Sequence, residues 1–317
     1  MRFTEFVFKE EIYPIIEMSL KKYLARPTEM AFNSAHGLAF HRGLGTPLYP
    51  SSATPLKKYL DADTVAEYAQ SAYSKPSFAV VANGASQEDL KKWVGEFFNN
   101  VPATAQHNLK AEQTKYHGGE ERIAHTGGNA MVLAFPGSST PTGPFYKPEV
   151  AVLAALLGGQ TTIKWSPGFS LLSKATQNAP NMHIDTQSTI YSDAGLLTIT
   201  MSGSASDIKT SAPKVVEALK GVAEGINKED FAKAKALAKF KELEFGQETQ
   251  AGMELAGAGL VHGGKPYQID EVAKAADSVT EEQVKKVAQE ALKNKASVST
   301  VGDLYMLPYA EEIGLQV

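Results

Sequence analysis

The stretch of sequence that decides the fold lies near the end of the chain and reads VTEEQVKKVAQEAL, residues 279–292. Thr280, followed three residues later by Gln283, matches a capping box, in which the two residues satisfy amides at the start of a helix. Apolar residues then recur with the spacing of one helix face, at Val284, Val287, Ala288, Ala291 and Leu292. The stretch therefore predicts an amphipathic helix that begins after Thr280.

The same helix pattern occurs 219 positions earlier in the chain. There Asp61 stands as the N-cap, and the apolar stripe reads Val65, Tyr68, Ala69, Ala72 and Tyr73. Both predicted helices lead into strand-forming residues that end at a glycine, 77–84 in the first case and 297–302 in the second. Because a helix–strand–glycine unit rarely recurs at a nearly constant offset by chance, we interpret the chain as two homologous halves.

A small, polar, proline-broken stretch separates the two halves. We place the C-terminal portion of a first domain at 1–100, a linker at 101–116 and a second domain at 117–317. The second domain carries predicted strands at 130–135, 186–191, 196–201 and 297–302, and predicted helices at 150–157 and 215–223. This grouping favours the α+β class, with helices on one face of a mostly antiparallel sheet. The first half has one predicted strand, at 77–84, and a helix behind the N-cap Ser86, so we expect it to lack its N-terminal part.

Composition excludes several broad classes of function. The chain has 317 residues, no cysteine, and a formal net charge of −4 from 31 Lys+Arg against 35 Asp+Glu. Without cysteine it has no disulfide scaffold, thiolate zinc site or cysteine nucleophile. The slightly acidic balance disfavours a broad electrostatic surface for nucleic acid. No apolar run approaches the ~20 residues that a membrane-spanning helix needs.

The histidines do not have the spacing of a peptidase zinc site. The zincin motif places two His four apart on one helix with a Glu beside them, whereas His36 and His41 are five apart. His117, Glu121 and His125 would share one face of a helix, but the Gly-Gly pair after His117 disfavours a helix there. We therefore assign no catalytic, cofactor-binding or metal-binding residue from the sequence.

Glycine-rich and lysine-rich stretches do not indicate a nucleotide or nucleic-acid site. The stretch from Gly158 to Lys164 has Ile163 where a phosphate-binding loop needs a glycine before the lysine. The stretch 43–45, Gly-Leu-Gly, does not extend to a dinucleotide fingerprint, and we interpret it as a turn or a close backbone contact. The lysines between Lys228 and Lys241 are interspersed with apolar residues, which favours a solvated helix with a partly buried side.

The order of these segments resembles a known family, the pitrilysin-like metallopeptidases and their inactive relatives, the core proteins of ubiquinol–cytochrome c reductase. The resemblance rests on residues 60–73 followed by 80–84, and on the upstream residues 35–48, and it covers essentially the whole chain. It implies two homologous domains, each a sheet flanked by helices, with the zinc-binding His-x-x-Glu-His of the family upstream of Met1. Glu17 is the nearest candidate for the family's distal zinc carboxylate. Its spacing to His36 does not match, and we interpret it as a helix-surface residue.

The loop at 157–172 distinguishes groups within this family. In the α subunit of mitochondrial processing peptidase, the corresponding loop is long and glycine-rich and handles presequences. Here the glycines are replaced by residues that stiffen the loop and give it surface to pack, Ile163, Lys164, Trp165 and Pro167. This version resembles the loop of the core protein 2 group in its fungal form. Trp165, Phe169 and Leu171 are candidate partner contacts, with packing inside the domain as the alternative.

The resemblance implies a structural role without a cofactor or a metal of its own. It implies a subunit of mitochondrial ubiquinol–cytochrome c reductase that supports electron transfer from ubiquinol to cytochrome c and has no peptidase activity. The implied partners are core protein 1, cytochrome b, cytochrome c1, the iron–sulfur protein and the small subunits of a dimeric complex. The implied location is the matrix side of the inner membrane, reached through these partners. Two alternatives stay open, a presequence-binding α-type subunit of processing peptidase and a zinc metallopeptidase whose motif lies upstream.

Overall fold

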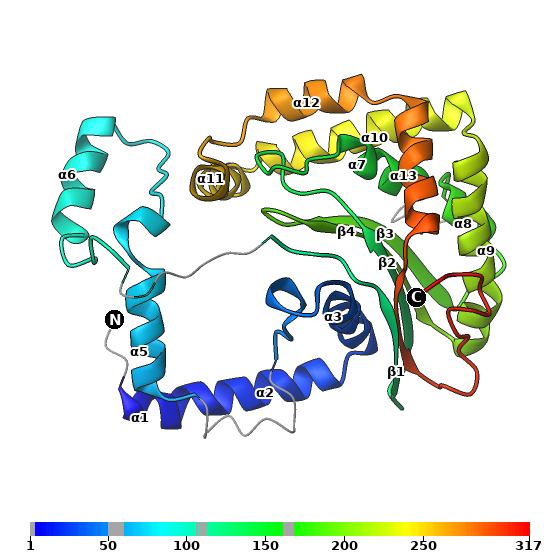
Figure 1. Ribbon diagram of the computed structural model, residues 1–317, viewed down its shortest axis with the longest axis horizontal. Coiled ribbons are helices and arrows are strands. Elements are labelled where there is room, and N and C mark those ends of the chain that lie inside the picture. The colour runs from blue at the N-terminus through cyan, green and yellow to red at the C-terminus, as the bar shows by residue number, and fades with distance from the viewer. Residues whose placement is uncertain (1–3, 50–59, 106, 108–112, 161–167) are drawn as a thin grey trace. The chain divides into compact units, whose positions relative to one another are not determined.

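The computed structural model describes residues 4–49, 60–105, 107, 113–160 and 168–317 of the chain (Figure 1). The chain forms two compact units, and neither unit is one continuous stretch. Unit 1 consists of Met1–Lys22, Tyr49–Gln113 and Phe245–Gln268. Unit 2 consists of Tyr23–Leu48, Thr114–Glu244 and Ile269–Val317.

Unit 2 is built on a five-stranded sheet with the order β1-β5-β2-β4-β3. The strands are β1 (Gly119–Ala124), β2 (Asn129–Pro136), β3 (Met182–Ile190), β4 (Gly195–Gly203) and β5 (Ser297–Gly302). Three neighbouring pairs are antiparallel, and β1 pairs with β5 in parallel. The expected α+β class with a mostly antiparallel sheet is confirmed, and the strands expected in the second half are all present.

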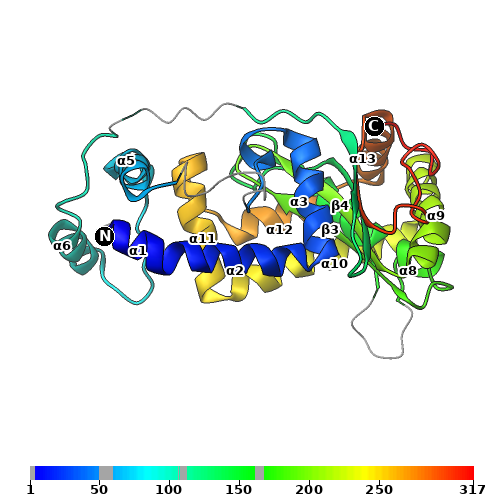
Figure 2. The ribbon, with the colours of Figure 1, turned by 90° about the horizontal axis from the view of Figure 1, so that it is seen from below.

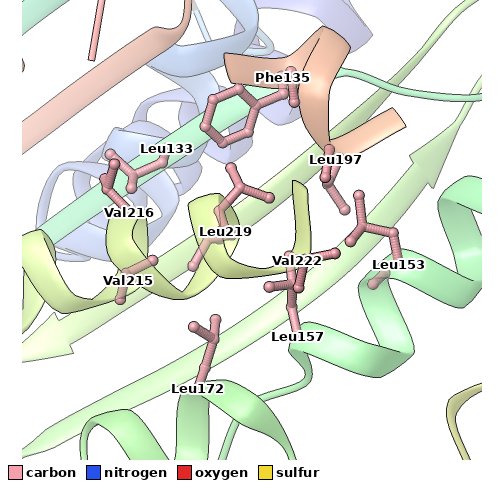
Figure 3. Close-up of a cluster of buried hydrophobic side chains, with 14 of the residues drawn as sticks. Leu133, Phe135, Leu153, Leu157, Leu172, Leu197, Val215, Val216, Leu219 and Val222 are labelled. Atoms are coloured by element: carbon pink, nitrogen blue, oxygen red, sulfur yellow. The ribbon is translucent and has the colours of Figure 1, made fainter. Parts of the chain in front are cut away.

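Helices cover one face of this sheet and enclose the main core of unit 2. They are α7 (Pro148–Leu157), α8 (Leu171–Ala175), α9 (Ala205–Glu224), the first part of α10 (Lys228–Gln247), and α13 (Glu281–Lys293), with α12 (Ile269–Ser278) packed against α7. Figure 3 shows Phe135 of β2 in one cluster with Leu219 of α9 and Leu157 of α7. The capping box of Thr280 and Gln283 is present at the start of α13, as predicted. Gly158 ends α7 with a positive φ of 60°, which glycine adopts with less strain than residues that have a side chain.

A helix from the N-terminal part of the chain, α3 (Pro27–Phe40), covers the opposite face of the sheet (Figures 1 and 2). Strand β2 explains this arrangement because it is apolar on both faces. Its residues Met131, Leu133 and Phe135 belong to the main core, whereas Ala130, Val132 and Ala134 belong to a second cluster. The α3 side chains of that cluster are Met30, Ala31, Ala35, Ala39 and Phe40. The sequence predicted helices on one face, and α3 adds a helix on the other.

Unit 1 is helical over the residues that the structure describes. It contains α1 (Glu5–Val7), η1 (Phe8–Ile12), most of α2 (Tyr13–Leu24), α5 (Ala62–Ala72), η3 (Lys75–Ser77), α6 (Gln87–Phe97), α11 (Thr249–Ala258) and η4 (Gly259–Gly263). Phe8, Tyr13 and Ala62 form a small core. The predicted N-caps are confirmed: Asp61 accepts a hydrogen bond from the amide of Thr64, and Ser86 accepts one from the amide of Asp89.

The strand predicted at 77–84 is wrong. Lys75–Ser77 form a 3₁₀ turn, and residues 78–82 have no regular secondary structure. Strand-forming residues become a strand only where neighbouring strands complete their backbone hydrogen bonds. Within the described residues, every strand of the sheet lies in unit 2. Residues 78–82 therefore have β-forming composition without a sheet to join.

The division into homologous domains at 1–100 and 117–317, with a linker at 101–116, stays a prediction, because the compact units follow packing and not ancestry. One described residue of the linker, His107, is attached to α5. The amide of His107 donates to Ser71 Oγ at 3.1 Å, and His107 Nε2 lies 3.2 Å from Glu67 Oε1. None of the helices in the described ranges is long and apolar enough to span a membrane.

Candidate functional site

The most developed polar cluster of unit 2 lies where α3 covers the sheet. The helix begins at Pro27, whose fixed φ suits the first helical position, after the extended residue Arg26. Its buried residues Ala31, Ala35 and Ala39 are small, so the helix can pack closely on β2 and β5. Polar side chains inside this contact must find hydrogen-bond partners, because their unpaired burial is costly.

His36 is the most buried histidine of the described chain, with 6% of its surface exposed. Its Nδ1 lies 2.8 Å from the carbonyl oxygen of Phe32, and its Nε2 lies 2.7 Å from the hydroxyl of Tyr191. A carbonyl only accepts, so Nδ1 carries the proton and Nε2 accepts from the Tyr191 hydroxyl. Burial lowers the pKa of His36 and raises the pKa of Tyr191. Both effects favour the neutral pair that this hydrogen bond needs.

Two further hydrogen-bonded groups join the same helix and its neighbouring loop to the sheet. Ser299 Oγ donates to Ser34 Oγ at 2.8 Å, and Ser34 Oγ donates in turn to the carboxylate of Glu121 on β1. Tyr116 donates to the carbonyl oxygen of Ala134 at 3.0 Å and accepts from Ser297 Oγ at 3.0 Å. Burial raises the pKa of Tyr116 to about 12, so its hydroxyl keeps its proton at physiological pH. These contacts fix the position of α3 on the sheet.

The three residues considered as a zinc site, His117, Glu121 and His125, do not lie on a helix. Glu121 belongs to strand β1, with His117 before that strand and His125 directly after it. Four residues of extended chain span ~13 Å, so this spacing separates the three side chains instead of bringing them together. His125 Nε2 contacts the carbonyl oxygen of Leu24 at 2.9 Å, and its Nδ1 accepts from the amide of Gly127. Among the described residues no three His, Asp or Glu side chains form a group that could hold a metal ion.

His41 and His117 form a stacked pair, with ring centroids 3.9 Å apart and planes 9° from parallel. His41 ends α3 with φ 58° and ψ −59°, and the amide of Arg42 bonds back to the carbonyl oxygen of Phe40 at 2.6 Å. This is the geometry of a γ-turn, which is strained for a residue with a side chain. The next turn, η2 (Gly43–Gly45), matches the predicted close contact, since a methyl on Gly45 would lie 3.0 Å from the carbonyl oxygen of His36.

Glu17 is exposed on α2, as the sequence interpretation expected.

The distinctive loop at 157–172 is described only at its two ends. Ile163, Lys164, Trp165 and Pro167 lie outside the described residues, so the expectations for them stay predictions. At the base of the loop, Thr186 Oγ1 donates to the carbonyl oxygen of Gly158. The amide of Gln160 donates to the carbonyl oxygen of Ile184 at 2.8 Å. Phe169 is 76% exposed, whereas Leu171 packs against the main core. Of the two described contact candidates, Phe169 therefore suits a partner contact and Leu171 suits packing within unit 2.

Sequence reasoning missed the structural roles of His36, Tyr191 and Arg122. Phe32, His36 and Phe40 recur every four residues, and this aromatic stripe was a usable signal that His36 is buried. No local signal identifies Arg122, whose guanidinium donates to the carbonyl oxygens of Leu304, Leu307 and Pro308, more than 180 residues away.

Comparison with known proteins identifies the family of this chain, which the geometry alone does not. The family model described as "Peptidase M16 inactive domain" matches residues 59–237, which is more than half of the chain. Cytochrome b-c1 complex subunit 2 of Neurospora crassa is 46% identical over 310 residues, covering 97% of this chain and 68% of that protein. The chain belongs to the peptidase M16 family, in the group of cytochrome b-c1 complex subunit 2. The resemblance of the sequence to the core proteins is thereby confirmed.

Two further comparisons show how far this likeness extends. Mitochondrial-processing peptidase subunit alpha-2 of Dictyostelium discoideum is 26% identical over 297 residues, covering 90% of this chain and 64% of that protein. A solved structure titled "Complex III2 from Candida albicans, Inz-5 bound" contains a chain that superposes with a TM-score of 0.78 at 14% identity. That superposition covers 95% of this chain and 73% of the other, and it shows that the two chains share a fold.

Proposed function

We propose that this chain is a non-catalytic structural subunit of a mitochondrial cytochrome b-c1 complex. The observation that carries the proposal is the 46% identity to a protein named as subunit 2 of that complex, over 97% of the chain. Identity spread over the whole length supports a shared role better than a short matched motif would. In this role the subunit supports the complex that transfers electrons from ubiquinol to cytochrome c, without a redox group of its own.

We further infer that the chain has no peptidase activity. The description of the matching family model as an inactive domain supports this inference. Two histidines of the described chain, His36 and His125, also have structural partners that would compete with a metal. His36 and His125 each form hydrogen bonds through both ring nitrogens. The ring of His117 stacks on the ring of His41. A hydrolytic zinc site needs free imidazole nitrogens and an open coordination position.

The partners of the proposed subunit would be core protein 1, cytochrome b, cytochrome c1, the iron–sulfur protein and the small subunits of a dimeric complex. Such a subunit would lie on the matrix side of the inner membrane and be held there by its partners. Permanent complexes of this kind bury about 2,000 Å² or more at an interface. The exposed side chain of Phe169 is one group that such an interface would cover.

The test is purification of the cytochrome b-c1 complex in mild detergent from mitochondria of an organism that carries this chain with an affinity tag. We expect the chain to be recovered in a constant ratio to haem b and to core protein 1. Deletion of its gene should lower the amount of assembled complex. Recovery of the chain free of the complex, together with unchanged complex levels in the deletion strain, would contradict the proposal.

A second candidate function is presequence binding as an α-type subunit of mitochondrial processing peptidase. The 26% identity to a processing peptidase subunit over 90% of the chain favours it, but less strongly than the 46% match favours the first function. The same tagged preparation separates the two. Co-purification with a β-type peptidase subunit, stoichiometric zinc and chelator-sensitive cleavage of a presequence peptide would support the second candidate.

A further inference from the structure

Three large side chains of the C-terminal segment face solvent within five residues of one another. Tyr305 is fully exposed, Met306 is 39% exposed and Tyr309 is 53% exposed. They belong to the turn Leu304–Tyr309, which follows β5 after Asp303 and is here called the aromatic turn. Isolated exposed apolar residues are common, but a group of them on one short turn indicates a contact surface.

The aromatic turn is held to the sheet by Arg122 of β1. The guanidinium donates to the carbonyl oxygens of Leu304, Leu307 and Pro308 at 2.8 to 2.9 Å. It also lies 3.8 Å from the centre of the Tyr309 ring, a distance at which a cation and an aromatic face attract. The Arg122 side chain is only 12% exposed, so these bonds are largely shielded from water.

Other contacts fix the backbone of the aromatic turn and the residues that flank it. Asp303 accepts from the amide of Tyr305 at 3.1 Å, and Glu312 accepts from the amide of Tyr309 at 2.9 Å. Leu307 and Ala310 are buried in the main core. In Figure 2 the C-terminal segment after β5, drawn in red, runs beside α9 in unit 2. A surface fixed in advance loses little conformational entropy when a partner binds, which favours affinity.

The charged side chains of the C-terminal segment, residues 303–317, all have the same sign. Residues 303–317 contain the acidic residues Asp303, Glu311 and Glu312 and no Lys, Arg or His. Arg122 is occupied by its carbonyl bonds and lies 3.7 Å from Glu120. A cation of unit 2, Lys220, lies near Gly314, five residues beyond Tyr309. A complementary surface would therefore offer an apolar recess for Tyr305 with Lys or Arg at its rim.

We propose that the aromatic turn is a docking contact for a neighbouring protein subunit that presents an apolar recess rimmed by Lys or Arg. The inference rests on the proposed function, because a permanent complex supplies such a neighbour. Tyr305 and Met306 enter the recess, and Tyr309 is held against Arg122 at its edge. Tyrosine is enriched among the residues that contribute most to binding at interfaces.

Photo-crosslinking in the intact complex tests this proposal. A benzophenone amino acid replaces Tyr305 in the tagged chain, and the matched control carries it in place of Phe240, an aromatic residue of α10 that is 58% exposed. We expect the probe at 305 to crosslink a different subunit, at a peptide that contains Lys or Arg beside apolar residues. The control should not reach that peptide. A crosslink to a second copy of this chain, or none to any protein, would overturn the proposal.

Substitutions give an independent measurement. We expect Tyr305→Ser combined with Met306→Ser to lower retention of the chain in the complex at least about tenfold during a detergent wash. Tyr305→Phe should retain the chain as the wild type does, and Glu311→Lys should weaken retention most at low salt. Limited proteolysis of each variant reports whether unit 2 stays folded.

The outcomes also separate this inference from the proposed function. If the wild-type chain does not co-purify with the complex, the proposed function fails. If the wild-type chain co-purifies, but neither the crosslinker nor the substitutions at 305 and 306 give the expected result, only the docking contact is wrong.

Discussion

The hydroxyl of Tyr191 donates a hydrogen bond to Nε2 of His36 across 2.7 Å, joining two residues that are 155 positions apart in sequence. His36 lies on α3 and Tyr191 directly follows β3, so the bond ties the helix to the sheet that it covers. The rings of Phe32 and Phe40 lie beside the imidazole at 4.5 and 6.2 Å between centroids. This apolar setting disfavours a charged imidazole and makes the contact sensitive to pH.

The free energy of unfolding of unit 2 should fall as the pH drops below about 6.5, the usual pKa of a histidine. Burial lowers the folded-state pKa of His36. The unfolded state then binds a proton more readily than the folded state, and acid favours unfolding. The loss should begin below the unfolded pKa and level off below the folded one. Urea unfolding between pH 5 and pH 8 measures it.

The control for this prediction is His36→Gln, which keeps a side-chain amide but removes the titration. The difference in unfolding free energy between wild type and variant should change by up to about 1.4 kcal/mol per pH unit, the slope that corresponds to the uptake of one proton on unfolding. A difference that stays constant from pH 5 to pH 8 would show that His36 does not titrate differently on folding.

Tyr191→Phe should lower the free energy of unfolding by about 1–2 kcal/mol, because a buried imidazole nitrogen loses its hydrogen-bond donor. Tyr305→Phe is the matched control, since the same oxygen is removed from a fully exposed ring. Thermal and urea unfolding of both variants measure the effect. Equal stability of the two variants would mean that water replaces the Tyr191 hydroxyl without loss.

The elements that were predicted correctly from the sequence carry strong local signals. The capping box at Thr280 and the N-caps Asp61 and Ser86 each act within a few residues of chain. The strand predicted at 77–84 failed because strand formation depends on neighbouring strands, which local sequence does not specify. The position of α3 on the sheet was not predicted either, since it depends on the fit of small residues to strands about 100 and 260 residues away.

The polar cluster under α3 could be predicted less well than the fold. The sequence disfavoured a helix through His117, Glu121 and His125, because the Gly-Gly pair is a local signal. It did not pair Ser34 with Ser299, or His36 with Tyr191, because each bond joins segments that meet only after folding. A side chain's polarity shows that it needs a partner when buried, but not which partner it finds.

Thr300→Val should raise the free energy of unfolding by about 1 kcal/mol. Thr300 is fully buried on β5, and its hydroxyl has no hydrogen-bond partner within the described structure. Valine has nearly the same shape and removes the cost of an unsatisfied hydroxyl. Thr186→Val is the matched control and should destabilise, because Thr186 Oγ1 donates to the carbonyl oxygen of Gly158. A stability change of the same sign in both variants would contradict this explanation.

Two glycine-to-alanine substitutions should have opposite effects. A methyl on Gly195 would overlap the carbonyl oxygen of Ser138, so Gly195→Ala should lower the free energy of unfolding by about 1–3 kcal/mol. Gly221 lies inside α9, and such a methyl would have no atom within 4 Å apart from its chain neighbours and the nearby backbone of the helix itself. Gly221→Ala should therefore raise the free energy by about 0.5–1 kcal/mol, because alanine loses less backbone entropy in a helix. Urea unfolding of the two variants measures both effects.

Arg122→Met should loosen the C-terminal segment before it unfolds the rest of unit 2. The variant keeps the apolar stem but loses the guanidinium bonds to Leu304, Leu307 and Pro308, at a cost of about 2–3 kcal/mol. The amide of Leu307, bonded to the carbonyl oxygen of Asp303, should exchange its hydrogen faster than amides of β2. Arg42→Met is the control, because Arg42 is exposed and its loss should leave Leu307 protected. Equal exchange at Leu307 in the two variants would show that the apolar contacts of Leu307 and Ala310 hold the segment without Arg122.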